Sequence, residues 1–531
     1  MNGKNGMKKL YYNGAVYVGG GELAEAFVVE NGRFGPVGGN SLLESYPAYE
    51  KTDLQGAFVC PGFNDSHMHL LGYGLILRQA PLHAHTESLA DMLDCLRTFL
   101  ARNPLSAGQW LIGRGFNQDY FKGAARLPSR SDLDGVSREI PILITRVCGH
   151  MGVVNSKALE ILDIAENTAV SGGAVDLEEG RFYDNALELV KAKLPQPSKG
   201  EIKEMIVSAV KELNRRGVTS VQTDDYCVFK KIAPAVINEA YRELEREGAL
   251  TVRICEQCNF TTLEELKSFV DSGEVRKGSE LFRIGPVKLL GDGSLGSRTA
   301  HLTKPYKGSS EYGFSLFAPE RLQEMISYAH RSGLQVIVHA IGDKCLDEVL
   351  EAFEKALKEL PRPDHRYGIV HCQVTREDQL DRIARLGLRV YAQSVFLDYD
   401  NHIAEKLLDP ELLKTSYSWK TLLEKGVSVS NGSDCPVEEP DCLKGIQLAV
   451  TRTSLDGTGP YLPSEAFTVA EALDSFTFRG AEASFEEKVK GRIKEGQLAD
   501  YVILDKDPFK AAPEDIRKIK VVAAYLGGRK L

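Results

Sequence analysis

The chain has 531 residues, of which 43% are hydrophobic and 26% are charged. This balance is typical of a folded globular protein with a large core, and it excludes a mainly disordered chain. The 65 basic and 74 acidic residues give a net charge of -9, which disfavours nucleic acid and anionic lipid as partners. The length predicts several structural units, although a single (β/α) barrel can take up roughly 250 residues alone.

The N-terminal residues do not resemble a secretion signal. Lys4, Lys8 and Lys9 are followed by tyrosines and a glycine-rich turn instead of an apolar segment. Elsewhere no apolar run approaches the roughly 20 residues of a membrane-spanning helix. The ten cysteines are scattered along the chain, which does not match a disulfide framework. We therefore expect a cytoplasmic protein with reduced thiols and no membrane partner.

Both ends of the chain are predicted to form short β-strands. We interpret residues 1–56 and 485–531 as one composite, discontinuous β-sandwich domain. The runs of β-branched and aromatic residues that support it lie at 15–18, 26–29, 501–505 and 521–526.

The central part of the chain has the pattern of an α/β barrel. From Val218 onward, short β-branched runs alternate with amphipathic helical stretches, which implies parallel strands joined by crossover helices. One further strand is expected upstream, at 57–63. The predicted fold class is therefore α/β, with a TIM-like (β/α)8 catalytic barrel formed by residues 57–70 and 218–484. Its seven later strands are predicted at 218–223, 250–255, 284–290, 334–339, 367–371, 389–394 and 427–430.

Residues 71–217 separate the first predicted strand from the second. This interval is far longer than a crossover connection requires. We therefore expect an inserted α/β segment after strand 1, lying over the active-site face of the barrel.

Polar side chains follow several of the predicted strands at the point where each strand ends. His67 and His69 are two residues apart after the first strand, so period-2 alternation turns both to the same side. His339 and His371 end two later strands, and Asp434 follows the last one. Strand ends from across a barrel meet only at its C-terminal mouth, where catalytic residues gather. Imidazoles with a carboxylate suit zinc or another borderline divalent ion, whereas unrelated structural histidines are the alternative.

Several separated motifs resemble the metal-dependent amidohydrolase superfamily. Pro61-Gly62-Phe63 precedes the His-x-His pair, and the later histidines and the final Ser433-Asp434 occur in that superfamily's order. Residues 491–500 are similar to the stretch that leads its chain back into the β-sandwich. Residues 288–300 and 149–156 resemble the amidohydrolase 3, or YtcJ-like, branch, which includes N-substituted formamide deformylases. The resemblance spans nearly the whole chain.

The resemblance implies roles for further residues. Lys288 stands where the superfamily's binuclear members carry a carboxylated lysine between two metals, so two zinc ions are implied if Lys288 is modified. An unmodified Lys288 paired with an acid such as Asp292, beside a single metal, is the alternative. Arg298, His150 and Asp292 are expected to bind substrate; a structural ion pair remains open for Arg298, and a structural loop histidine remains open for His150.

The implied activity is hydrolysis of a non-peptide C–N bond in a small molecule: an N-acyl, N-formyl or cyclic amide. A metal-bound hydroxide would attack the carbonyl, and Asp434 would serve as metal ligand and as general acid and base. The same chemistry on an ester, lactone or carbamate is one alternative, and a non-catalytic regulatory protein that binds a metabolite is another. Self-association is common in the resembling family, so a homo-oligomer also stays open.

Overall fold

The structure is a computed structural model that describes residues 8–531 apart from 107, 123–125, 148–149, 165–167, 169, 171 and 276. The chain divides into two units, Met1–Tyr73 with Ile206–Leu531, and Gly74–Met205. The two crossings between the units fall within helices α2 (Leu70–Leu77) and α7 (Lys199–Arg215).

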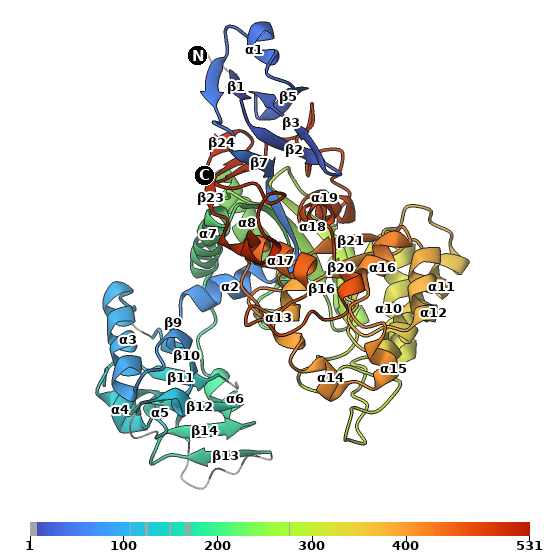
Figure 1. Ribbon diagram of the computed structural model, residues 1–531. Helices are drawn as coiled ribbons and strands as arrows, with labels where there is room; N and C mark the ends of the chain where they lie inside the picture. Colours follow the sequence, from blue (N-terminus) through green and yellow to red (C-terminus); the bar gives the residue numbers. More distant parts are fainter. Residues whose placement is uncertain are drawn as a thin grey trace. The chain divides into compact units, whose positions relative to one another are not determined.

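Eight parallel strands form a barrel in the first unit, in the order of the sequence (Figure 1). The first and last strands meet where the Asp434 amide donates to the His67 carbonyl at 2.8 Å. This confirms the predicted TIM-like barrel. Its strands are β8 (Phe63–Met68), β15 (Val218–Thr223), β16 (Arg253–Asn259), β17 (Phe282–Leu290), β18 (Val336–Ala340), β19 (Gly368–His371), β20 (Arg389–Ala392) and β21 (Ser428–Asn431).

Amphipathic helices follow the strands and bury their apolar faces. In α11 (Asp343–Glu359), Leu346, Val349, Leu350 and Phe353 repeat at helical spacing and are buried. The other principal helices are α8 (Pro234–Arg246), α9 (Leu263–Asp271), α10 (Pro319–Arg331), α12 (Glu377–Arg385), α16 (Trp419–Glu424), α17 (Cys442–Thr451), α18 (Val469–Ser475) and α19 (Phe478–Ala483).

The first barrel strand differs from the prediction. The run predicted as one strand at 57–63 divides at Gly62 into β7 (Phe58–Pro61), which belongs to another sheet, and β8. A Cβ at Gly62 would come within 2.1 Å of the Thr219 Oγ1 atom, so only glycine lets the chain pass this close to β15. The barrel strand therefore starts at Phe63, and His67 lies inside it.

Two further sheets of the first unit contain the chain ends. The six-stranded sheet β24-β23-β22-β7-β2-β3 joins strands from both ends, and the four-stranded sheet β5-β4-β1-β6 is N-terminal. Tyr11, Phe27, Tyr501 and Tyr525 stack between them. The strands are β1 (Lys8–Tyr12), β2 (Ala15–Gly19), β3 (Glu22–Ala24), β4 (Ala26–Glu30), β5 (Arg33–Gly38), β6 (Glu50–Asp53), β22 (Tyr501–Leu504), β23 (Val521–Leu526) and β24 (Arg529–Lys530).

The second unit has its own mixed sheet and its own core. Leu82, Met92, Leu96 and Ile144 belong to a buried cluster of this unit. The predicted insertion at 71–217 corresponds to it in sequence, and its position over the catalytic face stays a prediction. Its elements are β9 (Ala80–Pro81), α3 (Leu89–Arg102), β10 (Leu111–Phe116), α4 (Arg130–Asp134), β11 (Ile142–Arg146), β12 (Met151–Val154), α5 (Ser156–Leu162), β13 (Gly173–Asp176), β14 (Arg181–Asp184) and α6 (Leu187–Lys191).

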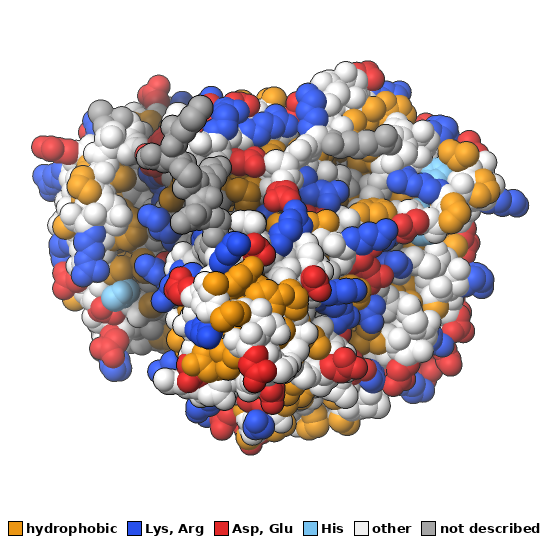
Figure 2. All heavy atoms as spheres, turned by 90° about the horizontal axis from the view of Figure 1, so that it is seen from above, with side chains coloured by type: hydrophobic (Ala, Val, Ile, Leu, Met, Phe, Trp, Pro, Cys, Tyr) orange, Lys and Arg blue, Asp and Glu red, His pale blue; other side chains and the backbone are white. Residues whose placement is uncertain are grey.

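The surface carries charges of both signs. On the face drawn in Figure 2, basic and acidic side chains are interspersed with polar and apolar ones. None of the helices in the described part of the chain could span a bilayer, because none combines the necessary length with an apolar composition.

Candidate metal centre

Six predicted site residues lie at the C-terminal ends of the barrel strands. His67, Lys288, His339 and His371 belong to β8, β17, β18 and β19, while His69 directly follows β8 and Asp434 lies in the loop after β21. Because the strands are parallel and adjacent, these ends share one edge of the barrel. The arrangement brings together side chains that are up to 367 residues apart in the sequence, as His67 and Asp434 are.

The first group of potential ligands surrounds the Asp434 carboxylate. Its Oδ1 atom lies 3.2 Å from the Nε2 atom of His69 and 3.4 Å from the Nε2 atom of His67. Ligand atoms of these three residues all lie within 4.8 Å of one another. The Nζ atom of Lys288 is 3.4 Å from the same Nε2 atom of His67. Lys288 therefore contacts this group of potential ligands through His67.

His339 and His371 form the second group. Their ring centroids are 4.4 Å apart, and the centroid of His371 is 5.7 Å from that of His67. All the imidazoles predicted from the strand ends therefore adjoin one site.

Hydrogen bonds fix which nitrogen of three imidazoles faces the site. The Nδ1 atoms of His67 and His371 lie 2.6 and 2.7 Å from the amide oxygens of Gln257 and Gln393. Nδ1 of His69 lies 2.7 Å from the Asp224 carbonyl oxygen. An oxygen acceptor requires a proton on Nδ1, so in its neutral form each ring has its lone pair on Nε2, the atom that a metal would bind.

His339 is held in the opposite orientation. Its Nε2 atom lies 3.0 Å from the Gly293 carbonyl oxygen and 3.4 Å from the Asp292 carboxylate. Protonation on Nε2 leaves the lone pair on Nδ1. The site thus offers three Nε2 atoms and one Nδ1 atom.

Sequence reasoning missed the two glutamines that orient His67 and His371. Gln257 lies inside β16, whose residues are all buried, and Gln393 directly follows β20. A polar amide in a buried barrel strand needs a partner, and this was the available signal. Gln257 and Gln393 find further partners in the carbonyls of Ser66 and Tyr391, which fixes the direction of each amide.

Two of the predicted ligands have a left-handed backbone. His371 has φ 76° and Asp434 has φ 55°, a conformation that is costly for residues other than glycine. The indole Nε1 atom of Trp419 donates to the His371 carbonyl at 3.1 Å, and the Asp434 amide donates to β8. The surrounding structure therefore holds both residues in place against this strain.

The environment favours an ionised carboxylate at Asp434 and neutral imidazoles at His67 and His371. Burial, followed by the charge of Lys288, holds the pKa of His67 well below its usual range, and burial and then His339 do the same for His371. Burial raises the pKa of Asp434, but the hydrogen bond from His69 and the nearby imidazoles lower it further, below its ordinary value. For His69 that bond outweighs burial and raises the pKa, so a metal that binds Nε2 would displace the proton that His69 shares with Asp434. Imidazole nitrogens with an ionised carboxylate are the donor set that zinc prefers, so these residues fit a divalent metal.

Lys288 is almost completely buried, with 1% of its surface exposed. Burial lowers the pKa of its amine, although Asp224 and Asp434 act in the opposite direction. Lys288 is therefore a neutral amine in a larger fraction of molecules than an exposed lysine would be.

The three residues predicted to bind substrate have different surroundings. The Asp292 carboxylate is buried and accepts from the amides of Ile341 at 3.0 Å, Gly342 at 2.8 Å and His301 at 2.9 Å. This geometry favours a role in which Asp292 holds His339 and the backbone of two loops in place. It does not favour direct contact of Asp292 with the substrate. Arg298 is exposed on the loop after β17, with φ 58°, and no ion pair to it occurs among the described residues. Its substrate role stays a prediction.

His150 belongs to the second unit. Its side chain is exposed and its Nδ1 atom lies 3.2 Å from the Asp184 carboxylate. The predicted contact with substrate stays a prediction. Gly149, which precedes His150 in the family-like motif, lies outside the described residues.

Comparison with known proteins tests the family that the motifs suggest. A family model described as "Amidohydrolase family" matches residues 50–531. The YtcJ protein of Bacillus subtilis (strain 168) is 32% identical over 537 residues, which cover 98% of this chain and 99% of that protein. The N-substituted formamide deformylase of Arthrobacter pascens is 26% identical, covering 95% of this chain and 94% of that protein.

A solved structure agrees with this match. An uncharacterized metal-dependent hydrolase from Pyrococcus furiosus aligns with a TM-score of 0.79 at 30% identity, covering 95% of this chain and 100% of that one. Sequence motifs, barrel and ligand geometry thus point the same way as matches over almost the full length. The chain belongs to the amidohydrolase family, in the branch that includes YtcJ and N-substituted formamide deformylase.

Proposed function

We propose that this protein is a metal-dependent hydrolase that cleaves a non-peptide C–N bond in an N-acyl, N-formyl or cyclic amide. The observation that carries the proposal is the set of imidazoles whose outer nitrogens are hydrogen-bonded, so that their lone pairs face the site beside Asp434. A structural histidine would have no need of a free, inward lone pair. The proposal of a C–N bond is supported by the relative from Arthrobacter pascens, whose name is N-substituted formamide deformylase.

His67, His69 and Asp434 would hold one ion, and His339 and His371 a second. A bound divalent metal supplies Lewis-acid polarisation of the carbonyl and lowers the pKa of a water molecule. The protein residues contribute orientation, because the hydrogen bonds of Gln257, Gln393 and the Asp224 carbonyl keep the rings from turning.

Asp434 would also move the proton of the reaction. Its carboxylate is ionised, since its pKa is held below the ordinary value, and it lies within 3.4 Å of two imidazole Nε2 atoms. It would accept a proton from the attacking water and deliver it to the departing nitrogen, which leaves as an amine.

Lys288 would serve as a carbamate between the two ligand groups. Its neutral amine forms an N–C bond with carbon dioxide and loses one proton, which yields an anionic side chain that two cations stabilise. Its burial, its lowered pKa and the 3.4 Å distance to His67 support this assignment. The alternative is an unmodified amine beside one metal. A density map at Lys288 with anomalous scattering at the zinc edge separates the two, since density beyond Nζ and two metal peaks are expected.

The test of the proposed function is a hydrolysis screen combined with removal of metal. We expect the zinc-loaded protein to release amine from N-formyl, N-acyl or cyclic amides. Chelation should abolish this activity and lower the melting temperature, because ligands from five strand ends lose their common partner, and added zinc should restore both. Matched esters, lactones and carbamates are the comparison. If an ester, lactone or carbamate is hydrolysed faster than the amides, the enzyme acts on that class of bond instead of on a C–N bond. Full activity after complete metal removal would contradict the metal-dependent mechanism.

A further inference from the structure

A cavity of about 490 Å³ opens at the end of the barrel opposite the metal centre. Its lining comes from Cys255 of β16, from residues before and at the start of β17, and from the segments that precede β18 and β19, together with Ser484, Phe485, Glu486 and Val489 after α19. Strand β17 runs between the two sites: Arg283 lines the cavity near the start of the strand, and Lys288 reaches the metal centre. Five residues of extended strand separate them by about 16 Å. The cavity is therefore distinct from the catalytic site.

Of the cationic side chains in the lining, Lys277 pairs with Glu274 at 2.9 Å, whereas Arg283 and Arg362 keep free hydrogen-bond donors. Arg283 donates to the Ser484 carbonyl at 3.0 Å, and its nearest carboxylate, that of Glu486, is 3.8 Å away. Arg362 donates to the Leu334 carbonyl at 2.8 Å, and within the described ranges no acidic side chain pairs with it. Each guanidinium has five N–H donors in a planar fork, so both retain donors for a further acceptor.

The acidic residues of the lining already have other partners. Glu486 lies 2.9 Å from the Lys490 ammonium and accepts from the Ser484 hydroxyl at 2.8 Å. Glu280 pairs with Arg33 at 2.7 Å. Within the described residues, Glu486 reaches Arg283 only at 3.8 Å and no acidic side chain pairs with Arg362, so the charge of the lining is suited to an anion.

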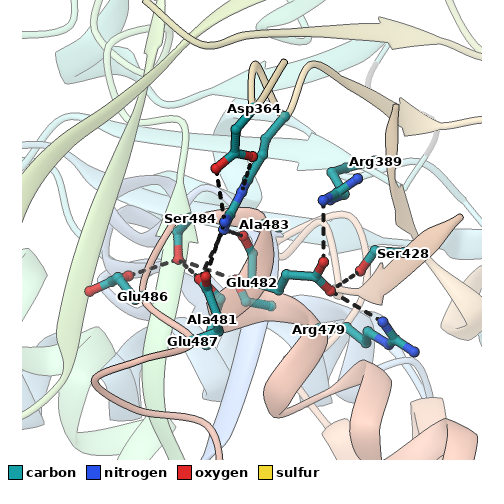
Figure 3. Close-up of polar contacts among 12 residues, drawn as sticks. Asp364, Arg389, Ser428, Arg479, Ala481, Glu482, Ala483, Ser484, Glu486 and Glu487 are labelled. Atoms are coloured by element: carbon teal, nitrogen blue, oxygen red, sulfur yellow. Dashed lines mark hydrogen bonds and ion pairs between the residues drawn. The ribbon is translucent and has the colours of Figure 1, made fainter. Parts of the chain in front are cut away.

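The residues that flank one wall of the cavity, Glu482 and Glu487, are held by several contacts. Figure 3 shows Glu482 of α19 between Arg389, Ser428 and Arg479, with contacts of 3.2, 2.6 and 3.2 Å. The next residues are anchored as well, because Arg366 makes two hydrogen bonds to Glu487, at 2.8 and 3.0 Å. The wall is preorganised, which lowers the cost of binding a ligand against it.

Phe485 provides an apolar surface in this wall. It has φ 60°, an uncommon conformation for an aromatic residue, and its ring packs 4.1 Å from the Arg366 guanidinium. Backbone strain that the surrounding contacts maintain is typical of ligand sites. Leu334, Ile284 and Val489 add further apolar lining.

We propose that this cavity is a second ligand site, which binds a small organic anion through Arg283 and Arg362. The ligand would carry a carboxylate or phosphate group, whose oxygens match the guanidinium fork, on a compact apolar body that packs against Phe485. The volume lies within the range of small-molecule sites.

Calorimetric titration of the zinc-loaded protein with benzoate, phenyl phosphate and inorganic phosphate tests the site. We expect benzoate or phenyl phosphate to bind, and the tighter of the two identifies the anionic group. Arg283→Gln and Arg362→Gln should each weaken binding by about tenfold or more, because a charged hydrogen bond is lost. Arg321→Gln is the matched control, since this arginine of α10 pairs with Glu264 and Glu324 outside the cavity, and it should leave binding unchanged.

Two outcomes would overturn the proposal. One is the absence of binding for both aromatic anions up to about 10 mM, which is weaker than ordinary small-ligand affinities. The other is unchanged affinity in both glutamine variants, which would place the anion elsewhere, for example at the metal centre. If inorganic phosphate binds as tightly as phenyl phosphate, the ring of the ligand contributes nothing to affinity, and Phe485 has no part in binding. Arg283→Lys separates loss of binding from misfolding. This variant should show a native circular dichroism spectrum and should bind the anion more tightly than Arg283→Gln does.

Discussion

Asp434 combines three features that rarely occur together in one side chain. It is nearly buried, it stays ionised because imidazoles surround it, and its backbone adopts φ 55°. The left-handed conformation turns the carboxylate back toward β8, where it meets His67 and His69. A residue held in this way is positioned for chemistry at a cost to stability.

Replacing Asp434 by Asn tests its part in proton transfer. Asp434→Asn should lower kcat, measured per bound zinc, by roughly 10²- to 10⁴-fold, because an amide cannot accept and return a proton. Asp381→Asn is the control, since Asp381 is an exposed residue of α12 that pairs with Lys425, and it should have normal kcat. Normal turnover of zinc-loaded Asp434→Asn would show that another group carries the proton.

Gln257 offers a separate test of ligand orientation. Gln257→Leu should weaken zinc binding about 10- to 100-fold, because His67 loses the acceptor that fixes its tautomer. Competition with a chelator measures this affinity. Gln323→Leu removes a partly buried amide of α10, which contacts Ser327, and should bind zinc normally. Equal zinc affinity in the two variants would remove the orienting role of Gln257.

Helical segments after the strands carry buried polar groups of their own. Asp400, at the end of α13 (Leu397–Asp400), accepts hydrogen bonds from Tyr417 at 2.8 Å and Gln373 at 2.9 Å. Burial nevertheless raises its pKa to about 7. The folded protein therefore keeps a proton on Asp400 that the unfolded chain releases above pH 3.8.

This difference gives stability a dependence on pH. Between about pH 4 and pH 7 the folded state binds more protons at Asp400, so the free energy of unfolding should fall by roughly 1.4 kcal/mol for each pH unit as pH rises. Asp400→Asn should lose this contribution. Chemical denaturation of both proteins at several pH values measures the difference between their slopes. Parallel curves would mean that Asp400 titrates alike in the folded and unfolded states.

The split of the first strand shows how one residue determines two elements. Residues 58–68 form an almost continuous run, but β7 pairs with β2 and β22, whereas β8 pairs with β15. The absence of a side chain at Gly62 lets the chain pass Thr219 and change sheets. Side chains alternate between the two faces of a strand, so the residue at which β8 begins determines which face His67 occupies. Gly62 determines that starting point.

At the scale of the molecule, a buried ion pair joins the barrel to the sheet that contains the C-terminus. Arg253 of β16 makes two hydrogen bonds to Asp500, at 2.6 and 2.9 Å, and only 6% of each side chain is exposed. Asp500 immediately precedes β22, so this pair fixes the point where the chain leaves the barrel and enters that sheet.

Breaking this pair should destabilise the whole first unit. Arg253→Leu leaves the Asp500 carboxylate buried without a cation, and the free energy of unfolding should fall by roughly 3–5 kcal/mol in chemical denaturation. Arg385→Leu removes an exposed arginine that pairs with Glu354 at 3.4 Å, and should cost about 1 kcal/mol or less. Similar losses in the two variants would show that solvent screens the Arg253 pair as well.

The sequence by itself determined the barrel, its strand order and the residues at the strand ends. Alternating β-branched and amphipathic runs are local patterns, and parallel strands bring their ends together whatever the details. His67, His69, His339, His371 and Asp434 could therefore be named before their distances were known, whereas Lys288 was implied by the resemblance to the amidohydrolase superfamily.

Only the tertiary structure decided how those residues are held. Gln257, Gln393 and the Asp224 carbonyl orient the imidazoles from neighbouring strands, and Asp292 is occupied by three backbone amides. The cavity at the opposite end of the barrel likewise draws its lining from segments far apart in the chain. Hydrogen-bond partners and cavities depend on the register between strands and on burial, and these properties arise only when distant segments pack against one another.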